Sequence, residues 1–131
     1  LSVLTTAESI NPEVSILNEN FLNISKKVLN NIDAVFAIDV LEHILDIDTF
    51  LSKCCEVLSK TGKVIIQIPI NRSTMFTNPN VNFDGHIHYF SENSIRIAFE
   101  RNNIQVKNII KTSPRDTANG TEMIVIGERK Q

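Results

Sequence analysis

Glycine is scarce in this chain of 131 residues, and its four glycines (Gly62, Gly85, Gly120 and Gly127) are all isolated from one another. A loop that cradles a phosphate or a nucleotide cofactor needs clustered glycines, because only a residue without a Cβ lets the backbone approach the ligand closely. The sequence therefore contains neither a P-loop nor a dinucleotide-binding fingerprint.

Cysteine is also scarce, and the chain has neither a large net charge nor a long apolar run. Cys54 and Cys55 are the only cysteines, and because they are adjacent they form no ordinary disulfide or metal knuckle. The formal net charge of −2 provides no basic face for non-specific nucleic-acid binding. No apolar run approaches the roughly 18 residues that span a bilayer, and no segment resembles a secretion signal. We therefore expect a cytoplasmic protein without nucleic-acid or membrane partners.

The remaining composition is that of a globular protein, with 42% hydrophobic and 21% charged residues. Its length leaves room for one domain, spanning residues 1–131. In chain order, the patterning predicts a helix over Leu1–Asn11, a short strand over Val14–Leu17, a loop with a short helix over Asn18–Asn31, a strand over Ala34–Ile38, a helix over Thr49–Lys60, a strand over Lys63–Ile68, a long polar loop over Ile70–Phe90, a helix over Glu92–Asn102, and strands over Gln105–Lys111 and Glu122–Gly127.

The order of these elements predicts an α/β fold. Strands that alternate with helices are typical of a parallel sheet, and the two apolar runs at 34–38 and 63–68 suit strands buried on both faces. The last two strands are joined without a helix, so we expect the C-terminal strand to be antiparallel. Lys60-Thr61-Gly62 is expected to end the preceding helix, with Gly62 at positive φ, and Ser91 is expected to cap the next helix.

One cluster of chemically active residues follows the strand predicted over Ala34–Ile38, namely Asp39-Val40-Leu41-Glu42-His43. Ligands of open α/β sheets bind beyond the carboxyl ends of the strands, so these residues lie where a pocket is expected. Two acids and an imidazole can coordinate a cation or transfer a proton. The alternative is structural: an acid of the cluster caps the next helix, and His43 fills space at the rim of the sheet.

The same region resembles a known family. Asn31–Ile44 is similar to the FDxVxxxxVLEHV segment of class I S-adenosylmethionine-dependent methyltransferases. Four further segments follow in the family's order, so that the resemblance covers about residues 14–128. They are Asp46–Leu58 (dpxxxLxxxxxxLK), Leu58–Ile66 (LKPGGxLxI), Gly85–Ser91 (GHxxxFS) with Ile95–Val106 (lxxlxxxxGFxv), and the closing strand Glu122–Gly127.

The resemblance implies a Rossmann-like methyltransferase sheet with strand order 3-2-1-4-5-7-6. The implied reaction is methyl transfer from S-adenosylmethionine to an unknown, small-molecule substrate. The family's glycine-rich loop and first two strands, about 60 residues, have no counterpart here. We therefore expect an incomplete sheet, and weak or absent S-adenosylmethionine binding by this chain alone. The alternative is a degenerate, non-catalytic module of the same fold that binds a partner or stabilises an assembly.

On the cofactor side, the resemblance assigns four residues. Asn20 stands where the family usually has an adenine-contacting Asp, and an amide oxygen can still accept a hydrogen bond. Asp39, Val40 and Leu41 follow the strand that ends at the expected cofactor pocket.

On the substrate side, the resemblance assigns Glu42, His88 and Tyr89, with His43 and His86 as candidate catalytic bases. His86 and His88 alternate with one residue between them, so they share one face of an extended segment and face either a substrate or the sheet rim. Some quinone-type O-methyltransferases of the family hold a metal near the acid–histidine motif. Because the sequence shows no local ligand spacing, we expect no metal here.

Two further expectations concern the exposed parts of the domain. The segment from Met75 to Tyr89 is expected to be a mobile loop on the substrate side. The strand Ala34–Ile38 would normally pair with the family's glycine-loop strand, so its outer edge is expected to lack a partner. We therefore expect a homodimer through this edge.

Overall fold

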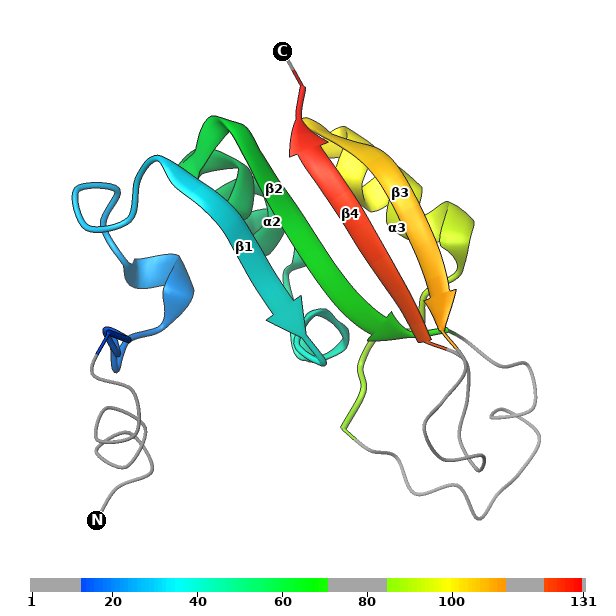
Figure 1. Cartoon of the computed structure of the whole chain (residues 1–131). Helices are drawn as coiled ribbons and strands as arrows, with labels where there is room; N and C mark the ends of the chain where they lie inside the picture. Colours follow the sequence, from blue (N-terminus) through cyan, green and yellow to red (C-terminus); the bar gives the residue numbers. More distant parts are fainter. Residues whose placement is uncertain (1–12, 71–84, 113–121, 131) are drawn as a thin grey trace.

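The computed structural model describes residues 13–70, 85–112 and 122–130 (Figure 1). The helix predicted over Leu1–Asn11 and most of the predicted loop at 75–89 lie outside these residues. The described elements are η1 (Phe21–Asn23), β1 (Ile32–Ile38), η2 (Leu41–His43), α2 (Ile47–Val57), β2 (Leu58–Pro69), α3 (Glu92–Arg101), β3 (Ile104–Thr112) and β4 (Glu122–Arg129).

The four described strands form one sheet with the order β1-β2-β4-β3 (Figure 1). β1 pairs with β2 in parallel, and β4 runs antiparallel to both β2 and β3. Three strands therefore run in one direction, and the C-terminal strand runs against them. The predicted α/β fold, mostly parallel with an antiparallel C-terminal strand, is confirmed.

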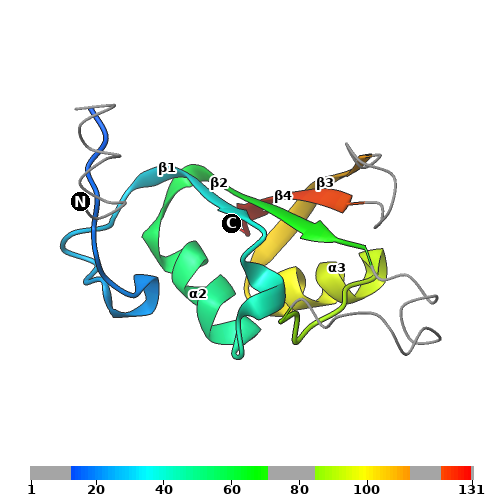
Figure 2. The same cartoon turned by 90° about the horizontal axis from the view of Figure 1, so that it is seen from below.

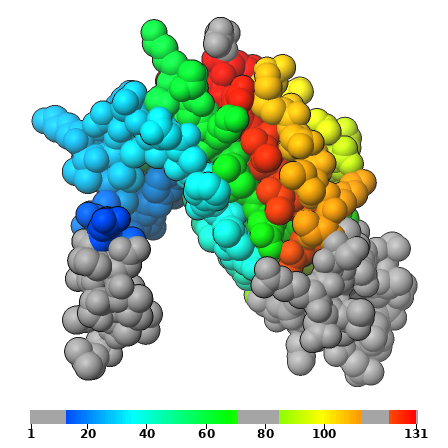
Figure 3. Space-filling view, in the orientation of Figure 1, coloured from blue at the N-terminus to red at the C-terminus, as the bar shows by residue number. Residues whose placement is uncertain are grey.

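Helices α2 and α3 both cover the same face of this sheet (Figure 2). The core lies between them and the inward side chains of the strands, such as Val64, Ile66 and Val125, which are fully buried. On the opposite face no described helix packs, and Figure 3 shows this face open to the viewer. Phe36 and Ile38 of β1 are 65% and 57% exposed there.

Side chains cap both helices, as predicted for Ser91, and α2 begins at Ile47 instead of the predicted Thr49. The side chain of Asp46 accepts a hydrogen bond from Thr49 N at 2.9 Å and caps α2. Ser91 and Ser94 bond each other's backbone N–H in a capping box at the start of α3. After α3, Asn103 adopts a left-handed φ of 58°, a conformation that Asn tolerates better than most residues.

Two local predictions are wrong. No strand forms over Val14–Leu17, where Val14 and Leu17 remain about half exposed and gain little from burial. Helix α2 ends at Val57, and Gly62 lies inside β2 with a negative φ instead of in a helix-ending turn. A Cβ at Gly62 would lie 2.5 Å from the carbonyl oxygen of Ile32, so the glycine allows close approach of β1 across an irregular register.

Candidate functional site

The chain turns sharply away from the sheet at the carboxyl end of β1. Asp39 has a left-handed φ of 52°, and its N–H donates to the carbonyl of Gln67 on β2 at 3.1 Å. Two residues later the fully buried side chain of Leu41 anchors η2 in the core. This turn fixes Glu42 and His43 directly after β1, at the edge of the sheet where open α/β folds bind ligands.

A second segment, distant in sequence, docks onto η2. The backbone N–H groups of Ile87 and His88 donate to the carbonyl of Glu42 at 3.0 and 3.1 Å. The Nδ1 atom of His43 lies 3.1 Å from the carbonyl oxygen of Gly85, which is 42 residues further along the chain. Gly85 has a φ of 77°, which few residues other than glycine adopt. These bonds bring Glu42, His43 and His86 together.

The carboxyl group of Glu42 is the least solvated acidic group of the cluster. The residue is 1% exposed, and within the described ranges neither of its oxygens has a hydrogen-bond partner. The Nε2 atom of His86 lies 3.9 Å from Oε1 of Glu42. Burying a polar group without a hydrogen-bond partner is costly, so among the described residues the carboxyl group of Glu42 does not stabilise the fold.

The three histidines and Tyr89 differ in their burial and in their ring contacts. The rings of His43 and His86 pack edge to face with centroids 4.7 Å apart, and those of His86 and Tyr89 with centroids 6.3 Å apart. His43 is exposed, whereas the side chain of His86 is 16% exposed. The Nε2 atom of His88 is buried and has no hydrogen-bond partner in the described part of the chain.

One carboxylate oxygen and two imidazole nitrogens form a compact set of possible metal-binding atoms. These atoms, from Glu42, His43 and His86, lie within 4.8 Å of one another, so one divalent cation could contact all three. We expected no metal because the sequence shows no ligands at close spacing. In the structure the third group, His86, comes from a distant segment. In the sequence that segment is marked only by Gly85 followed by the alternating histidines.

The residues assigned to the cofactor side are only partly available. Asp39 is exposed and Val40 is 36% exposed, at the carboxyl end of β1. The Oδ1 atom of Asn20 already accepts a hydrogen bond from Leu22 N at 3.0 Å, which caps η1. The side chain of Leu41 lies in the core and offers no surface. Of the residues assigned to the cofactor side, Asp39 and Val40 are therefore the ones exposed at the edge of the sheet where open α/β folds bind ligands.

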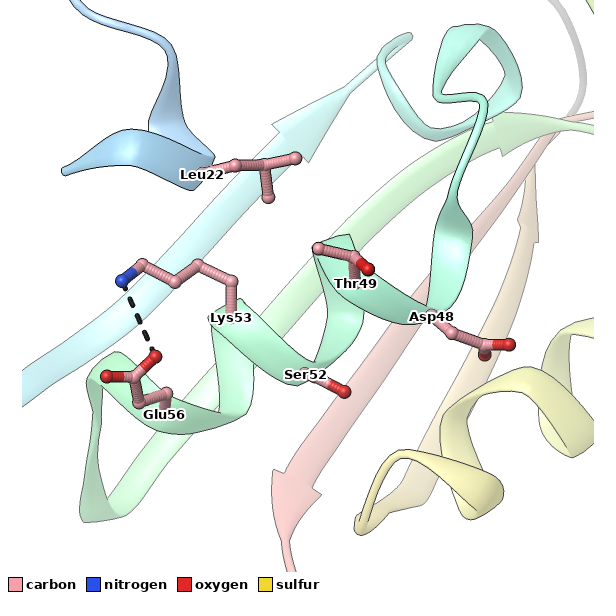
Figure 4. A pocket seen from close by; sticks show the side chains of 6 residues that line it. All are labelled: Leu22, Asp48, Thr49, Ser52, Lys53 and Glu56. Atoms are coloured by element: carbon pink, nitrogen blue, oxygen red, sulfur yellow. Dashed lines mark hydrogen bonds and ion pairs between the residues drawn. The ribbon is translucent and has the colours of Figure 1, made fainter.

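A groove of about 430 Å³ lies elsewhere, on the outer side of α2 (Figure 4). Its charged side chains are paired with each other or with α3. Lys53 Nζ lies 3.4 Å from Glu56, and hydrogen bonds from Asn102 and then Arg101 lower the pKa of Asp48. The groove contains none of the predicted site residues. It is lined by Leu22, Asp48, Thr49, Ser52, Lys53 and Glu56.

The cysteines contribute no nucleophile. Burial raises the pKa of the Cys54 thiol from 9.0 to about 12, and burial also raises the pKa of Cys55. Because the thiolate is the reactive form, both side chains are inert at neutral pH. Cys54 is fully buried in α2. None of the described helices is long and apolar enough to cross a membrane.

Comparison with known proteins identifies the family. A family model described as "Methyltransferase domain" matches residues 6–108. The human mitochondrial ubiquinone biosynthesis O-methyltransferase is 42% identical over 43 residues, which are 33% of this chain and 12% of that protein.

Solved structures show the same fold at low sequence identity. The 1,6-didemethyltoxoflavin-N1-methyltransferase of Burkholderia thailandensis, solved with bound S-adenosylhomocysteine, is 13% identical with a TM-score of 0.76, covering 98% of this chain and 56% of that one. The magnesium protoporphyrin IX methyltransferase of Synechocystis PCC 6803, also solved with this product bound, is 14% identical with a TM-score of 0.69, covering 97% and 57%. The chain thus spans little more than half the length of these two proteins.

The sheet order agrees with these matches. The observed order β1-β2-β4-β3 corresponds to 4-5-7-6, the last four strands of the order that the resemblance implies. The family model covers more than half of the chain, and the structural neighbours share its fold. The chain belongs to the class I S-adenosylmethionine-dependent methyltransferase family.

Proposed function

We propose that this chain is the C-terminal portion of the catalytic domain of an S-adenosylmethionine-dependent methyltransferase that acts on a small molecule. One observation carries the proposal: Glu42, His43 and His86 meet at the carboxyl end of β1, on the ligand-binding edge of the sheet. Among the described residues both oxygens of this buried carboxyl group lack a hydrogen-bond partner, and most buried polar groups in proteins have one.

On the cofactor side, Asp39 and Val40 are the exposed residues that follow β1. S-adenosylmethionine would supply an electrophilic methyl group at this edge. The Asp39 carboxylate would accept hydrogen bonds from the cofactor, and Val40 would cover an apolar part of it. A contact from Asn20 would come from its amide nitrogen or from the second lone pair of its oxygen, since that oxygen already accepts one hydrogen bond from Leu22 N.

On the substrate side, Glu42, His88 and Tyr89 would bind and orient the acceptor molecule. An imidazole of His43 or His86 would remove a proton from its hydroxyl or amine group where the nucleophile must be deprotonated. A small-molecule acceptor is supported by relatives named for 1,6-didemethyltoxoflavin, magnesium protoporphyrin IX and ubiquinone biosynthesis. Proximity and alignment of the two reactants would supply most of the rate.

Calorimetric titration of the 131-residue chain with S-adenosylmethionine tests this proposal. We expect binding weaker than micromolar, because the described residues contact only one edge of the cofactor and each buried ligand group left unpaired costs about 1–3 kcal/mol. Asp39→Ala should weaken binding further, whereas Glu56→Ala, on the outer side of α2, should not. A micromolar dissociation constant would contradict the expectation of weak binding, and an Asp39→Ala variant that binds like the parent would contradict the cofactor role of Asp39. Absence of binding at any concentration would contradict the proposed function.

The second candidate is the non-catalytic module of the same fold. It is favoured by the isolated positions of all four glycines, which provide no cofactor-cradling loop in this sequence. Under this alternative the chain binds no S-adenosylmethionine at any concentration in the same titration. Its binding surface would be the open face and outer edge of β1.

That edge also supports a homodimer. Among the described strands β1 pairs only with β2, so the backbone N–H and C=O groups on its other side have no strand partner. On the open face, Phe36 continues an apolar row with Ile65 and Ile126 across three strands. We propose that a second copy of the chain pairs with this edge and covers Phe36.

A further inference from the structure

The segment that brings His86 to the candidate site is anchored at both of its ends. At its C-terminal end, Phe90 is buried and forms a parallel bridge with Ile70, and α3 begins two residues later. At its other end lies Gly85, whose carbonyl oxygen is 3.1 Å from Nδ1 of His43. The first anchor belongs to the core of the fold, whereas the second lies at the site itself.

Between these two ends, backbone hydrogen bonds dock the segment onto η2. The N–H groups of Ile87 and His88 both donate to the carbonyl oxygen of Glu42, at 3.0 and 3.1 Å. Neither bond uses a side chain, so the docking depends on the path of the backbone through residues 85–88. The same path places Nε2 of His86 3.9 Å from Oε1 of the buried carboxyl group of Glu42.

The backbone conformation of Gly85 sets the start of this path. Its φ of 77° lies in the left-handed region, which is unfavourable for a residue with a Cβ because the Cβ crowds a carbonyl oxygen. Space is less restrictive at this position. Among the described residues beyond its chain neighbours, a Cβ here would meet only Nδ1 of His43, at an ordinary contact distance of 3.9 Å. Glycine is therefore required for its φ more than for its small size.

From these contacts we infer that Gly85 is a positioning residue of the proposed site, because its left-handed backbone docks residues 85–88 onto η2 and places His86 beside Glu42. The inference rests on the proposed function and deepens it, since it adds to the substrate side a residue that has no side chain. A residue that prefers a negative φ would direct the chain away from His43 and weaken both bonds to the carbonyl of Glu42. The substrate side would then open while the sheet and both helices stay folded.

Native-state hydrogen exchange of the 131-residue chain, followed by NMR, measures this docking. The amides of Ile87 and His88 exchange when their bonds to Glu42 open. The amides of Val64 and Val125, in the two central strands, report the opening of the whole sheet. In the parent chain we expect the two site amides to be protected, and to exchange faster than the two core amides.

A series of substitutions at Gly85 separates backbone conformation from bulk. We expect Gly85→Ala to speed the exchange of the Ile87 and His88 amides by roughly 5- to 30-fold, the factor that corresponds to a left-handed cost of about 1–2 kcal/mol. Gly85→Asn should have a smaller effect, although asparagine is larger than alanine, because asparagine tolerates a positive φ. The chain itself places Asn31 and Asn103 at φ values of 55° and 58°.

The matched control is Asn103→Ala, which introduces the same left-handed strain directly after α3, at the end of that helix remote from the site segment. Both Asn103→Ala and Gly85→Ala should speed the exchange of the core amides, because both lower the overall stability. Only the substitutions at Gly85 should speed the exchange of the site amides, because only they change the equilibrium between the docked and the undocked segment.

The inference is wrong if the site amides are unprotected in the parent, if Gly85→Asn speeds their exchange more than Gly85→Ala does, or if Asn103→Ala speeds it as much as Gly85→Ala. If Gly85→Ala fails to fold, Gly85→Asn must still speed the exchange of the site amides more than Asn103→Ala, and the opposite order overturns the inference. These measurements need no cofactor, so their failure is distinguishable from that of the proposed function, which the cofactor titration tests.

Discussion

The buried carboxyl group of Glu42 makes a direct prediction about stability. The residue is 1% exposed, and its oxygens have no hydrogen-bond partner among the described residues. Its nearest ion-pair contact, to His86, is long at 3.9 Å and compensates only partly for the loss of water. Glu42→Met replaces the carboxyl group with an apolar side chain of similar length. This change should therefore stabilise the fold while removing a residue of the proposed site.

The size of the effect follows from the missing hydrogen bonds. A buried polar group without a partner costs about 1–3 kcal/mol, and a charged one costs more. We therefore expect Glu42→Met to raise the free energy of unfolding by about 1–3 kcal/mol. Urea denaturation followed by circular dichroism measures it, since the chain has no tryptophan.

The matched control is Glu56→Met, which removes an exposed carboxylate with one ion pair to Lys53. This control should change the free energy of unfolding by no more than about 0.5 kcal/mol. A decrease of about 1 kcal/mol or more in Glu42→Met would refute the reasoning, because it would show that the carboxyl group has a strong partner in solution.

Three other predictions concern acid, thiols and assembly. Hydrogen bonds from Asn102 lower the pKa of Asp48, so the stability that this carboxylate contributes is complete above its ordinary pKa of 3.8 and is lost as the pH falls below it. Urea denaturation at neutral pH and at pH 3 should show that acid lowers the free energy of unfolding less in Asp48→Asn than in the parent. Equal decreases in the two chains would contradict this prediction. Cys54 and Cys55 should react with a thiol reagent at neutral pH only after unfolding, and a native chain that is labelled at once would show accessible thiolates. Sedimentation should show dimers that Phe36→Lys converts to monomers, and a parent chain that is monomeric at all concentrations would exclude pairing through β1.

Much of the fold could be predicted because buried strands and helices have characteristic local patterns of apolar residues. The apolar run at 34–38 lies inside β1, and that at 63–68 lies inside β2. The expected burial on both faces is wrong for β1, where Ala37 is buried but Phe36 and Ile38 are 65% and 57% exposed. The Ser91 cap could also be predicted from the local sequence, because a cap depends on residues within one helical turn. The strand order was predicted from the family resemblance, because no local sequence pattern shows which distant strands pair.

The errors and the missing part of the site arise from contacts that are not local. Gly62 has the sequence context of a helix end, but the carbonyl of Ile32 approaches it and requires a residue without a Cβ. The resemblance suggested a role for Glu42, but its burial and its contact with His86 depend on a segment more than 40 residues away, so only the structure showed them.

The central claim is that the carboxyl end of β1 is the cofactor side of a methyltransferase site. Titration of the ¹⁵N-labelled chain with S-adenosylhomocysteine, followed through the backbone amide signals, tests it most directly. We predict progressive shifts of Asp39 and Val40 that do not saturate at micromolar ligand, with Ser52 and Glu56 on the outer side of α2 unchanged. Shifts confined to the outer side of α2, or no shift of any amide at millimolar ligand, would contradict the account.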